Sequence, residues 1–461
     1  MTYKDRYDLI VIGSGPGGRR AAIQAAKFGK SVLVVEKGKR VGGVSVHTGT
    51  IPSKTLRETS LNLSGWRERE FYGRSYRVKQ NITADDLKKR LHMTLDHEVE
   101  VLEHQFARNS VQTLHGMARF QDPHTLKVTL SDDEELVLSS DKFIIATGSQ
   151  PYRPEFIPFD GVSIFDSDEI LNMKRAPKSI AVIGGGVIGV EYATIFSALD
   201  IPVTLIESRE TILDFVDQEI IATLLHELRD RGVVLRLGTA IEEITRVKNG
   251  RCKITLKSGR LIRSDMVLFA AGRYGATGEL GLEDVGIVPD DRGRLSVDGK
   301  TFQTDVANIY AVGDIIGFPS LASTSMEQGR IAACHAFNQL GYAPPEFFPY
   351  GIYSVPEIST VGMTEEEAKT ARIPYEVGIA RFRETSRGHI MGLDSGMMKM
   401  IVSLETRKLL GVHIIGEGAT ELIHIGQAVL NLSLIPNSAP TRPRLIAYAG
   451  VCVKKKGGGG G

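Results

Sequence analysis

The chain has 461 residues, 42% of them hydrophobic, and its 56 basic and 55 acidic side chains almost cancel. This length predicts two to four domains, and the balanced charge provides no global field that would hold nucleic acid or an anionic membrane. Three scattered cysteines without a metal-like spacing argue against a disulfide framework and predict a reducing, cytosolic compartment. We therefore expect small-molecule chemistry, with no metal, leader peptide or membrane span.

Two segments of the chain repeat each other without a gap. Residues 11–36 read VIGSGPGGRRAAIQAAKFGKSVLVVE and residues 182–207 read VIGGGVIGVEYATIFSALDIPVTLIE, and each predicts a strand, a glycine turn, a helix and a second strand. Both contain GxGxxG and end in a glutamate, at Gly13, Gly15, Gly18 and Glu36 and at Gly184, Gly186, Gly189 and Glu207. A lone GxGxxG is more often only a turn. Two in register predict two dinucleotide sites, each with phosphates at a helix N-terminus and a glutamate on a ribose.

Three further apolar strands end in turns of small residues. They are FIIATGSQP at 143–151, MVLFAAGRYG at 266–275, and IYAV, which is followed by Gly313 and Asp314. A glycine in such a turn lets the chain pass close to a cofactor, and an aspartate beside it is able to bind sugar-like hydroxyls. An ordinary strand exit or Gly-Asp turn explains each one alone about equally well. Their order gives each GxGxxG unit its own closing strand.

The order of these motifs resembles a flavoprotein family with two dinucleotide-binding domains. The series GxGxxG, GGxxxxxGTxPSK, ATG, GxGxxG, GR and YAVGD is similar to that of dihydrolipoamide dehydrogenase, glutathione reductase and mercuric reductase, over roughly residues 5–430. The resemblance implies an α/β fold with two Rossmann-like dinucleotide-binding domains, the NAD domain inserted in the FAD domain, plus a C-terminal α+β interface domain. The implied ranges are 1–150 and 273–340 for FAD, 151–272 for NAD(P) and 341–430 for the interface. A homodimer or higher oligomer is implied as well.

The family's motifs also imply which residues hold the cofactors. FAD is expected in the first unit, with Asp314 on the ribityl hydroxyls, and NAD(H) or NADP(H) in the second. Lys54, after the PSK turn, and Glu191 are the implied catalytic residues, because in the family the matching pair lies near flavin N5, where a cation stabilises the reduced flavin. The implied cofactor-binding residues are Gly13, Gly15, Gly17, Gly18, Glu36, Lys37, Gly42, Gly43, Ser45, Thr50, Lys54, Ala118, Thr147, Gly148, Gly184, Gly186, Gly189, Glu207, Arg209, Gly272, Arg273, Gly313, Asp314 and Ala322.

The stretch GGVSVHTGTIPSK at 42–54 departs from the disulfide reductases of that family. Ser45 and Thr50 occupy both positions of the family's cysteine pair, and no cysteine lies within 200 residues of them. Hydroxyls cannot form the disulfide that would carry electrons away from a flavin. Hydride exchange needs only the flavin and one nicotinamide site, so we expect an FAD enzyme that moves hydride between NADPH and NAD⁺.

Other functions and the choice of nucleotide stay open at this point. The same flavin would serve NAD(P)H oxidation by a quinone or another small acceptor, or a non-catalytic sensor that binds flavin and NADH. Glu207 favours NAD by hydrogen-bonding the ribose 2′-OH, whereas a transhydrogenase also accepts NADP(H). Arg209 either meets the 2′-phosphate or faces solvent.

The C-terminal part predicts an antiparallel sheet, a helix and an atypical tail. MMKMIVSLETRKLLGVHIIGE at 397–417 indicates two strands around a polar turn, and ATELIHIGQAVL at 419–430 indicates an amphipathic helix. His424 on this helix is expected to be packed or at an interface rather than catalytic. Residues 431–461 contain three prolines, a lysine run and five terminal glycines, which oppose a closing helix. They do not match the family's dimer-crossing segment, which leaves the dimer and the nicotinamide pocket open.

Overall fold

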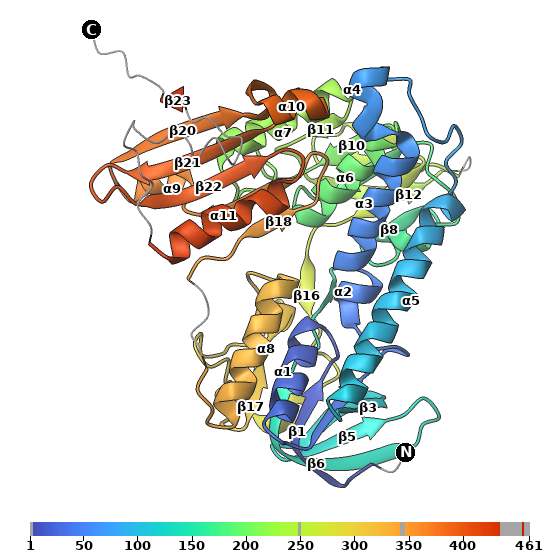
Figure 1. Cartoon of the computed structure of the whole chain (residues 1–461). Helices are drawn as coiled ribbons and strands as arrows, with labels where there is room; N and C mark the ends of the chain where they lie inside the picture. Colours follow the sequence, from blue (N-terminus) through green and yellow to red (C-terminus); the bar gives the residue numbers. More distant parts are fainter. Residues whose placement is uncertain (1–2, 248–249, 342–345, 434–453, 456–461) are drawn as a thin grey trace. The chain divides into compact units, whose positions relative to one another are not determined.

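The computed structural model describes residues 3–247, 250–341, 346–433 and 454–455. Most of the predicted tail, including Cys452, therefore lies outside the described residues. The chain divides into two compact units, formed by residues 1–55, 88–152 and 272–344 and by residues 56–87, 153–271 and 345–461. Each unit has its own sheets (Figure 1), and each has its own hydrophobic core.

The first unit is built on a sheet with the strand order β3-β2-β1-β6-β5-β4, and β17 also pairs with β6. Its strands are β1 (Arg6–Ile12), β2 (Val32–Glu36), β3 (Gln112–His115), β4 (Met117–Asp122), β5 (Thr125–Thr129), β6 (Glu135–Ile145) and β17 (Ile309–Ala311). β1, β2, β3, β17 and the second half of β6 run parallel, whereas β4, β5 and the first half of β6 form an antiparallel meander. The buried parallel strands are continuous apolar runs, as expected for strands covered on both faces.

Helices pack against this sheet, and the first unit also contains a separate two-stranded ribbon. The helical elements of the first unit are α1 (Pro16–Lys27), α2 (Gly43–His47), most of α5 (Ala84–Arg108), η3 (Leu282–Val285), η4 (Gly313–Ile316) and α8 (Ala322–Ala336), and the ribbon pairs β7 (Ser149–Pro151) with β16 (Arg273–Gly275). Helix α3 (Thr50–Ser64) begins in this unit, and its residues from Leu56 on belong to the second. α1 and α8 lie side by side (Figure 1). Their backbones meet at glycines, since a Cβ on Gly329 would lie 2.1 Å from the carbonyl oxygen of Gly17.

The second unit contains a parallel sheet with the order β11-β10-β9-β15-β8. Its elements are β8 (Ile164–Asp166), η2 (Ile170–Asn172), β9 (Ile180–Ile183), α6 (Val187–Ala198), β10 (Val203–Ile206), α7 (Gln218–Asp230), β11 (Val234–Arg236) and β15 (Met266–Phe269). An antiparallel sheet of β12 (Ile241–Arg246), β13 (Cys252–Leu256) and β14 (Leu261–Ser264) is inserted before β15. The repeat predicted at 182–207 is thus confirmed as the unit β9–α6–β10.

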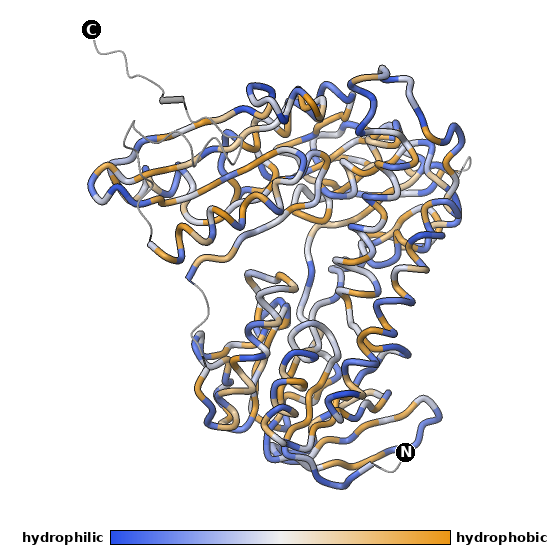
Figure 2. The backbone as a smooth tube through the Cα atoms, in the orientation of Figure 1, coloured by the Kyte–Doolittle hydropathy of each residue, from blue (hydrophilic) through white to orange (hydrophobic). Residues whose placement is uncertain are grey.

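An antiparallel sheet with the order β18-β19-β22-β21-β20-β23 forms the rest of the second unit. It comprises β18 (Tyr350–Ile352), β19 (Ile358–Gly362), β20 (Tyr375–Arg381), β21 (Met397–Ser403), β22 (Leu409–Ile415) and β23 (Lys454–Lys455), with α11 (Ala419–Asn431) packed on β19 and β22. Shorter helical elements are η1 (Trp66–Glu68), α4 (Arg69–Tyr72), α9 (Glu365–Thr370), η5 (Phe382–Glu384) and α10 (Ser386–Met391). The predicted hairpin and helix are both confirmed, and Figure 2 shows hydrophilic turns between the more hydrophobic strands.

His424 differs from its expectation within this chain. Its side chain is exposed on α11, where Nδ1 lies 3.1 Å from Oε1 of Gln427 in the same helix. The amphipathic pattern buries Ile423, Gly426 and Leu430 against the sheet and leaves His424 on the exposed side of the helix. A packed position is therefore wrong for His424, and a position at an interface stays a prediction.

A buried ion cluster ties β21 to α7 and α9. The ammonium of Lys399, 1% exposed, donates to Oδ1 of Asp217 at 2.9 Å and to Oε2 of Glu365 at 2.6 Å. Burial opposes the charge of Lys399, but the hydrogen bonds that it donates to these carboxylates outweigh this effect and raise the pKa of the lysine. Asp217 also caps α7 through the N–H of Glu219. The cluster compensates an aspartate whose side chain is fully buried.

His413 on β22 is held in a neutral form inside the same sheet. Its Nε2 lies 3.0 Å from the carbonyl oxygen of Met363, so this nitrogen carries the hydrogen and donates it. Nδ1 then accepts from the hydroxyl of Thr360 at 2.5 Å. Burial lowers the pKa of His413, because the charged imidazolium would lose its hydration.

We expect this histidine to make the fold less stable in mild acid. Below about pH 6.5 the unfolded chain binds a proton at His413 that the folded chain does not, so its contribution to stability is present above that pH and is lost as pH falls. Urea unfolding between pH 8 and pH 5.5 should show a component of up to about 1.4 kcal/mol per pH unit below pH 6.5, and His413→Gln should remove it. The exposed His92 provides the control, and an unchanged pH profile in His413→Gln would contradict the assignment.

Candidate dinucleotide sites

The three glycines of the first GxGxxG turn have different surroundings. Gly13 has φ +102°, and a Cβ there would lie 2.4 Å from the carbonyl oxygen of Ala146. A Cβ on Gly18 would lie 2.0 Å from the carbonyl oxygen of Gly13, so helix α1 packs on the turn without space for a side chain. Around Gly15, by contrast, no described atom lies within 4 Å of a Cβ position. The protein itself does not demand a glycine at residue 15.

The second turn repeats this arrangement. Gly184 has φ +113° and its Cβ would lie 2.5 Å from the carbonyl oxygen of Ala270, while a Cβ on Gly189 would lie 1.9 Å from the carbonyl oxygen of Gly184. Gly186 again has no described atom within 4 Å of its Cβ position. The open glycine in each turn is the N-cap of its helix, and neither N-cap has a side-chain hydrogen bond. Both turns thus provide the space and the N–H donors that a pyrophosphate needs.

Glu36 is fixed by the turn that precedes it. Its Oε2 accepts from the N–H of Ser14 at 3.0 Å and from the Ser14 hydroxyl, and its Oε1 accepts from the N–H of Gly38 at 2.8 Å. Ser14 is 1% exposed, and its hydroxyl oxygen also accepts from the N–H of Gly42 at 2.8 Å. A Cβ on Gly43 would lie 3.0 Å from Cα of Gly15. The loop at 42–43 therefore borders the first turn, and its contact with a cofactor stays a prediction.

Glu207 has the same backbone contact and a further one to arginine. Its Oε2 accepts from the N–H of Gly185 at 2.5 Å, and Oε1 accepts from the N–H of Arg209 at 2.9 Å. The Arg209 guanidinium contacts both carboxylate oxygens at 3.2 Å and pairs with Asp214 at 2.7 Å. Burial opposes ionisation of Glu207, but these hydrogen bonds outweigh it and lower its pKa to about 2. Arg209 is 45% exposed, whereas Glu207 is 6% exposed, so the arginine covers the carboxylate from the solvent side.

The other closing turns meet at the carboxyl edge of the first unit's sheet. Ser149, which follows the ATG turn, donates from its hydroxyl to Oδ2 of Asp314 at 3.0 Å. Arg273 donates to the Ser149 hydroxyl at 2.9 Å and to its carbonyl oxygen at 2.8 Å. The N–H of Gly313 donates to Oε1 of the buried Gln328 at 2.8 Å. Arg273, Ser149 and Asp314 thus lie in one hydrogen-bond network, and the predicted contacts of Arg273, Gly313 and Asp314 with a cofactor stay predictions.

Sequence reasoning missed Ser14, Ser149 and Gln328. Ser14 stands between the first two glycines of the turn, and Ser149 directly follows ATG, so their positions were the available signals. No signal in the sequence marks Gln328, because it lies within helix α8 and its hydrogen-bond partner belongs to another element.

Two buried hydroxyls support a ligand site in the first unit. The hydroxyl oxygens of Thr48 and Thr147 are buried and have no hydrogen-bond partner among the described residues. Buried polar groups are normally paired. Thr147 is a predicted cofactor-binding residue, so its orphaned hydroxyl fits an acceptor or donor supplied by a bound FAD.

The stretch that replaces the family's cysteine pair is helical. Ser45 lies on α2 and donates to the carbonyl oxygen of Gly42 at 3.2 Å, and Thr50 is the first residue of α3. The predicted PSK turn before a helix is wrong, because α3 already begins at Thr50 and contains Pro52. Proline is tolerated there, since the first N–H groups of a helix have no helical partner. Lys54 lies one turn into α3, with its ammonium 3.4 Å from Oγ of Ser53.

The two predicted catalytic residues belong to different units. Glu191 is 4% exposed on α6, and its Oε1 accepts from the backbone N–H of Tyr353 at 2.9 Å. Lys54 lies in the first unit and Glu191 in the second. Their pairing stays a prediction.

The remaining predicted residues have mixed surroundings. Lys37 is exposed and lies 3.5 Å from Glu279. Ala118 is buried on β4, Ala322 begins α8, and Gly272 has φ +126° just before β16. Their contacts with a cofactor stay predictions.

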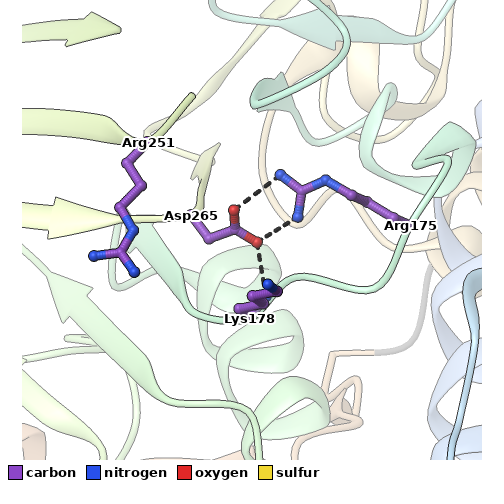
Figure 3. Close-up of a pocket in the computed structure, with 4 residues that line it drawn as sticks. All are labelled: Arg175, Lys178, Arg251 and Asp265. Atoms are coloured by element: carbon purple, nitrogen blue, oxygen red, sulfur yellow. Dashed lines mark hydrogen bonds and ion pairs between the residues drawn. The ribbon is translucent and has the colours of Figure 1, made fainter. Parts of the chain in front are cut away.

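A basic surface depression of about 540 Å³ lies elsewhere on the second unit. Arg175, Lys178, Arg251 and Asp265 line it, and Asp265 accepts from Arg175 at 2.9 Å and from the N–H of Lys178 at 2.7 Å (Figure 3). Lys178 and Asp265 come just before β9 and β15, so the depression is at the amino end of the parallel strands. The Gly184 turn follows the carboxyl end of β9, and the depression is separate from it.

Two βαβ units with open N-terminal turns and fixed strand-end glutamates define an α/β protein of the class that binds two dinucleotides. A family profile described as pyridine nucleotide-disulphide oxidoreductase matches residues 7–329, and the dimerisation domain of the same family matches residues 348–439. The chain belongs to the pyridine nucleotide-disulphide oxidoreductase family.

Similar proteins cover nearly the whole chain. A soluble pyridine nucleotide transhydrogenase of Mycobacterium tuberculosis is 52% identical over 92% of this chain and 90% of its own length. One of Colwellia psychrerythraea is 43% identical over 92% and 91%. Among solved structures, the HOCl-induced flavoprotein disulfide reductase RclA from Escherichia coli is 27% identical with a TM-score of 0.83, covering 95% of this chain and 97% of that one.

The described part of the chain offers neither a membrane-spanning helix nor a metal-binding cluster. Among those residues no helix is both long and apolar enough to cross a bilayer. The same residues contain no group of three or more His, Cys, Asp or Glu side chains placed to hold a metal ion.

Proposed function

We propose that this chain is an FAD-dependent transhydrogenase, which exchanges hydride between NADPH and NAD⁺ without a redox disulfide. Relatives that are 41–52% identical carry the name soluble pyridine nucleotide transhydrogenase. FAD is the cofactor, and NAD(H) and NADP(H) are the substrates. The observation that carries the proposal is that Ser45 and Thr50 stand where disulfide reductases of the resembling family have cysteines.

The residues of this chain have distinct roles in the proposed reaction. Bound FAD supplies a reversible two-electron carrier. The first turn holds its pyrophosphate at the N-terminus of α1, and the second turn holds that of the nicotinamide nucleotide at α6. Lys54 and Glu191 are the proposed catalytic residues: Lys54 would stabilise negative charge on the reduced cofactor, and the carboxylate of Glu191 is oriented by the N–H of Tyr353.

The proposed domains follow the same division. Residues 1–150 and 273–340 bind FAD, 151–272 bind the nicotinamide nucleotide and 341–430 form the interface. The match of 348–439 to a dimerisation domain supports a homodimer. A cytoplasmic location is supported by the scattered cysteines, of which Cys252 and Cys334 are free and buried.

Stopped-flow mixing tests the activity. We expect NADPH to bleach the flavin spectrum of the purified protein without a long-wavelength thiolate band, and NAD⁺ or its thio analogue to restore it. Restoration by a quinone but by no nucleotide would indicate an oxidoreductase for small acceptors. A reduced flavin that persists with every acceptor would indicate a sensor instead.

We expect Arg209 to discriminate between the two nucleotides. Replacing it with leucine should weaken NADPH roughly tenfold relative to NADH, because a 2′-phosphate loses a guanidinium partner and meets the uncovered Glu207. The half-saturating concentrations for flavin reduction by each nucleotide measure this. Arg263→Leu, an exposed arginine on β14, provides the control. An equal loss for both nucleotides would contradict this role of Arg209.

A further inference from the structure

A relay of three side chains joins the β7–β16 ribbon to the turn after β17. Arg273 Nε donates to the Ser149 hydroxyl oxygen at 2.9 Å, and the same hydroxyl donates to Oδ2 of Asp314 at 3.0 Å. Arg273 Nη2 also donates to the carbonyl oxygen of Ser149 at 2.8 Å. Two nitrogens of one guanidinium therefore donate hydrogen bonds to a single serine.

These hydrogen bonds determine the group to which the Ser149 hydroxyl donates its hydrogen. A guanidinium has donors only, so the Ser149 oxygen accepts from Arg273 and its hydrogen is left for Asp314. Hydrogen bonds in such a chain polarise one another, and one that ends on a carboxylate is charge-assisted. Ser149 is 8% exposed, which limits competition from water. The relay fixes the orientation of the Asp314 carboxylate.

The relay leaves one acceptor of Asp314 available. Oδ1 accepts no hydrogen bond from the described residues, while Oδ2 is used by Ser149. Asp314 is half-buried and follows β17 at the carboxyl edge of the parallel strands, the same edge that carries the Gly13 turn after β1. Ligands of open α/β sheets bind at this edge. Oδ1 of Asp314 is thus placed to accept a hydrogen bond from a hydroxyl of the ligand at the first GxGxxG turn.

We infer that Ser149 and Arg273 are positioning residues for the flavin, which act through Asp314 on a hydroxyl of the FAD polyol chain. This inference rests on the proposed binding of FAD in the first unit. Arg273 and Asp314 carry motif signals in the sequence, whereas Ser149 connects them and is the link that the geometry adds. The relay strengthens retention of FAD without itself touching the reacting atoms.

The rate of FAD release from the holoenzyme tests the relay. After dilution, flavin fluorescence should show roughly tenfold faster release from Ser149→Ala and from Arg273→Met than from the wild type, since each loses one charge-assisted step. Ser140→Ala and Arg119→Met are matched controls in the same unit. Ser140 donates a buried hydroxyl to backbone oxygens near the amino end of β1, and Arg119 pairs with Glu283 at the surface.

A double-mutant cycle separates positioning from general structural support. In an Asp314→Asn background, Ser149→Ala should add less than about twofold to the release rate, because the serine acts through that carboxylate. Arg273→Met enters the same cycle, so the test stands even where Ser149→Ala does not fold. Full additivity, or unchanged release from both single variants, would overturn the relay. Wild-type protein that retains no flavin would instead overturn the proposed function.

Discussion

Replacing Lys399 with methionine is expected to lower the free energy of unfolding of the second unit by about 3–5 kcal/mol. Methionine keeps the unbranched shape of the side chain but removes the ammonium that lies 2.9 Å from Asp217 and 2.6 Å from Glu365. Asp217 is fully buried and would keep an uncompensated charge. The cost therefore comes from the orphaned carboxylate more than from the lost attraction.

Urea unfolding followed by tryptophan fluorescence measures this effect. Trp66 is the chain's single tryptophan and lies in the second unit, where the guanidinium of Arg231 is 4.3 Å from its ring. Its emission therefore reports on the unit that contains the cluster. The free energy follows from the midpoint and slope of this transition.

Two further variants separate burial from simple charge loss. Lys369→Met removes an exposed lysine that also pairs with Glu365, so we expect it to cost no more than about 1 kcal/mol. Adding Asp217→Asn to Lys399→Met should recover part of the stability, since the amide still caps α7 and carries no charge. A loss below about 1 kcal/mol for Lys399→Met would show that the cluster is hydrated in solution.

The sequence determined most of the fold because the decisive signals are local. In a βαβ unit, one turn, one helix and one strand set the spacing between the glycines and the glutamate at the end of the second strand. Both copies could therefore be recognised from the amino-acid sequence alone. The alternating pattern of 397–417 likewise predicted the hairpin of β21 and β22, whose polar turn lies between its strands. These elements needed no knowledge of distant residues.

The parts that the sequence did not reveal join residues far apart in the chain. Ser149 contacts Arg273 and Asp314 across 124 and 165 residues, and Lys399 contacts Asp217 across 182. No spacing rule connects such positions, because the tertiary fold alone brings them together. The prediction of where α3 begins was wrong for a different reason. Proline is typical of turns, yet it also fits the first turn of a helix, because its missing N–H costs nothing there.

In the second GxGxxG turn, glycine-to-alanine substitutions at different positions are expected to separate nucleotide binding from folding. Gly186→Ala is expected to weaken binding of NAD⁺ and NADP⁺ by about 10- to 100-fold, because the new methyl group meets the pyrophosphate. The backbone at Gly186, with φ −78° and ψ −177°, suits any residue, and no described atom lies within 4 Å of the Cβ position. We therefore expect no loss of stability above about 1 kcal/mol.

Gly189→Ala is expected to give the opposite result. Its Cβ would lie 1.9 Å from the carbonyl oxygen of Gly184, so α6 must shift away from β9, at a cost of about 2–4 kcal/mol. Titration calorimetry with the oxidised nucleotides, beside urea unfolding, measures both quantities for each variant. If Gly186→Ala left nucleotide affinity intact, the open space at residue 186 would not hold a pyrophosphate, and the second repeat would serve packing alone.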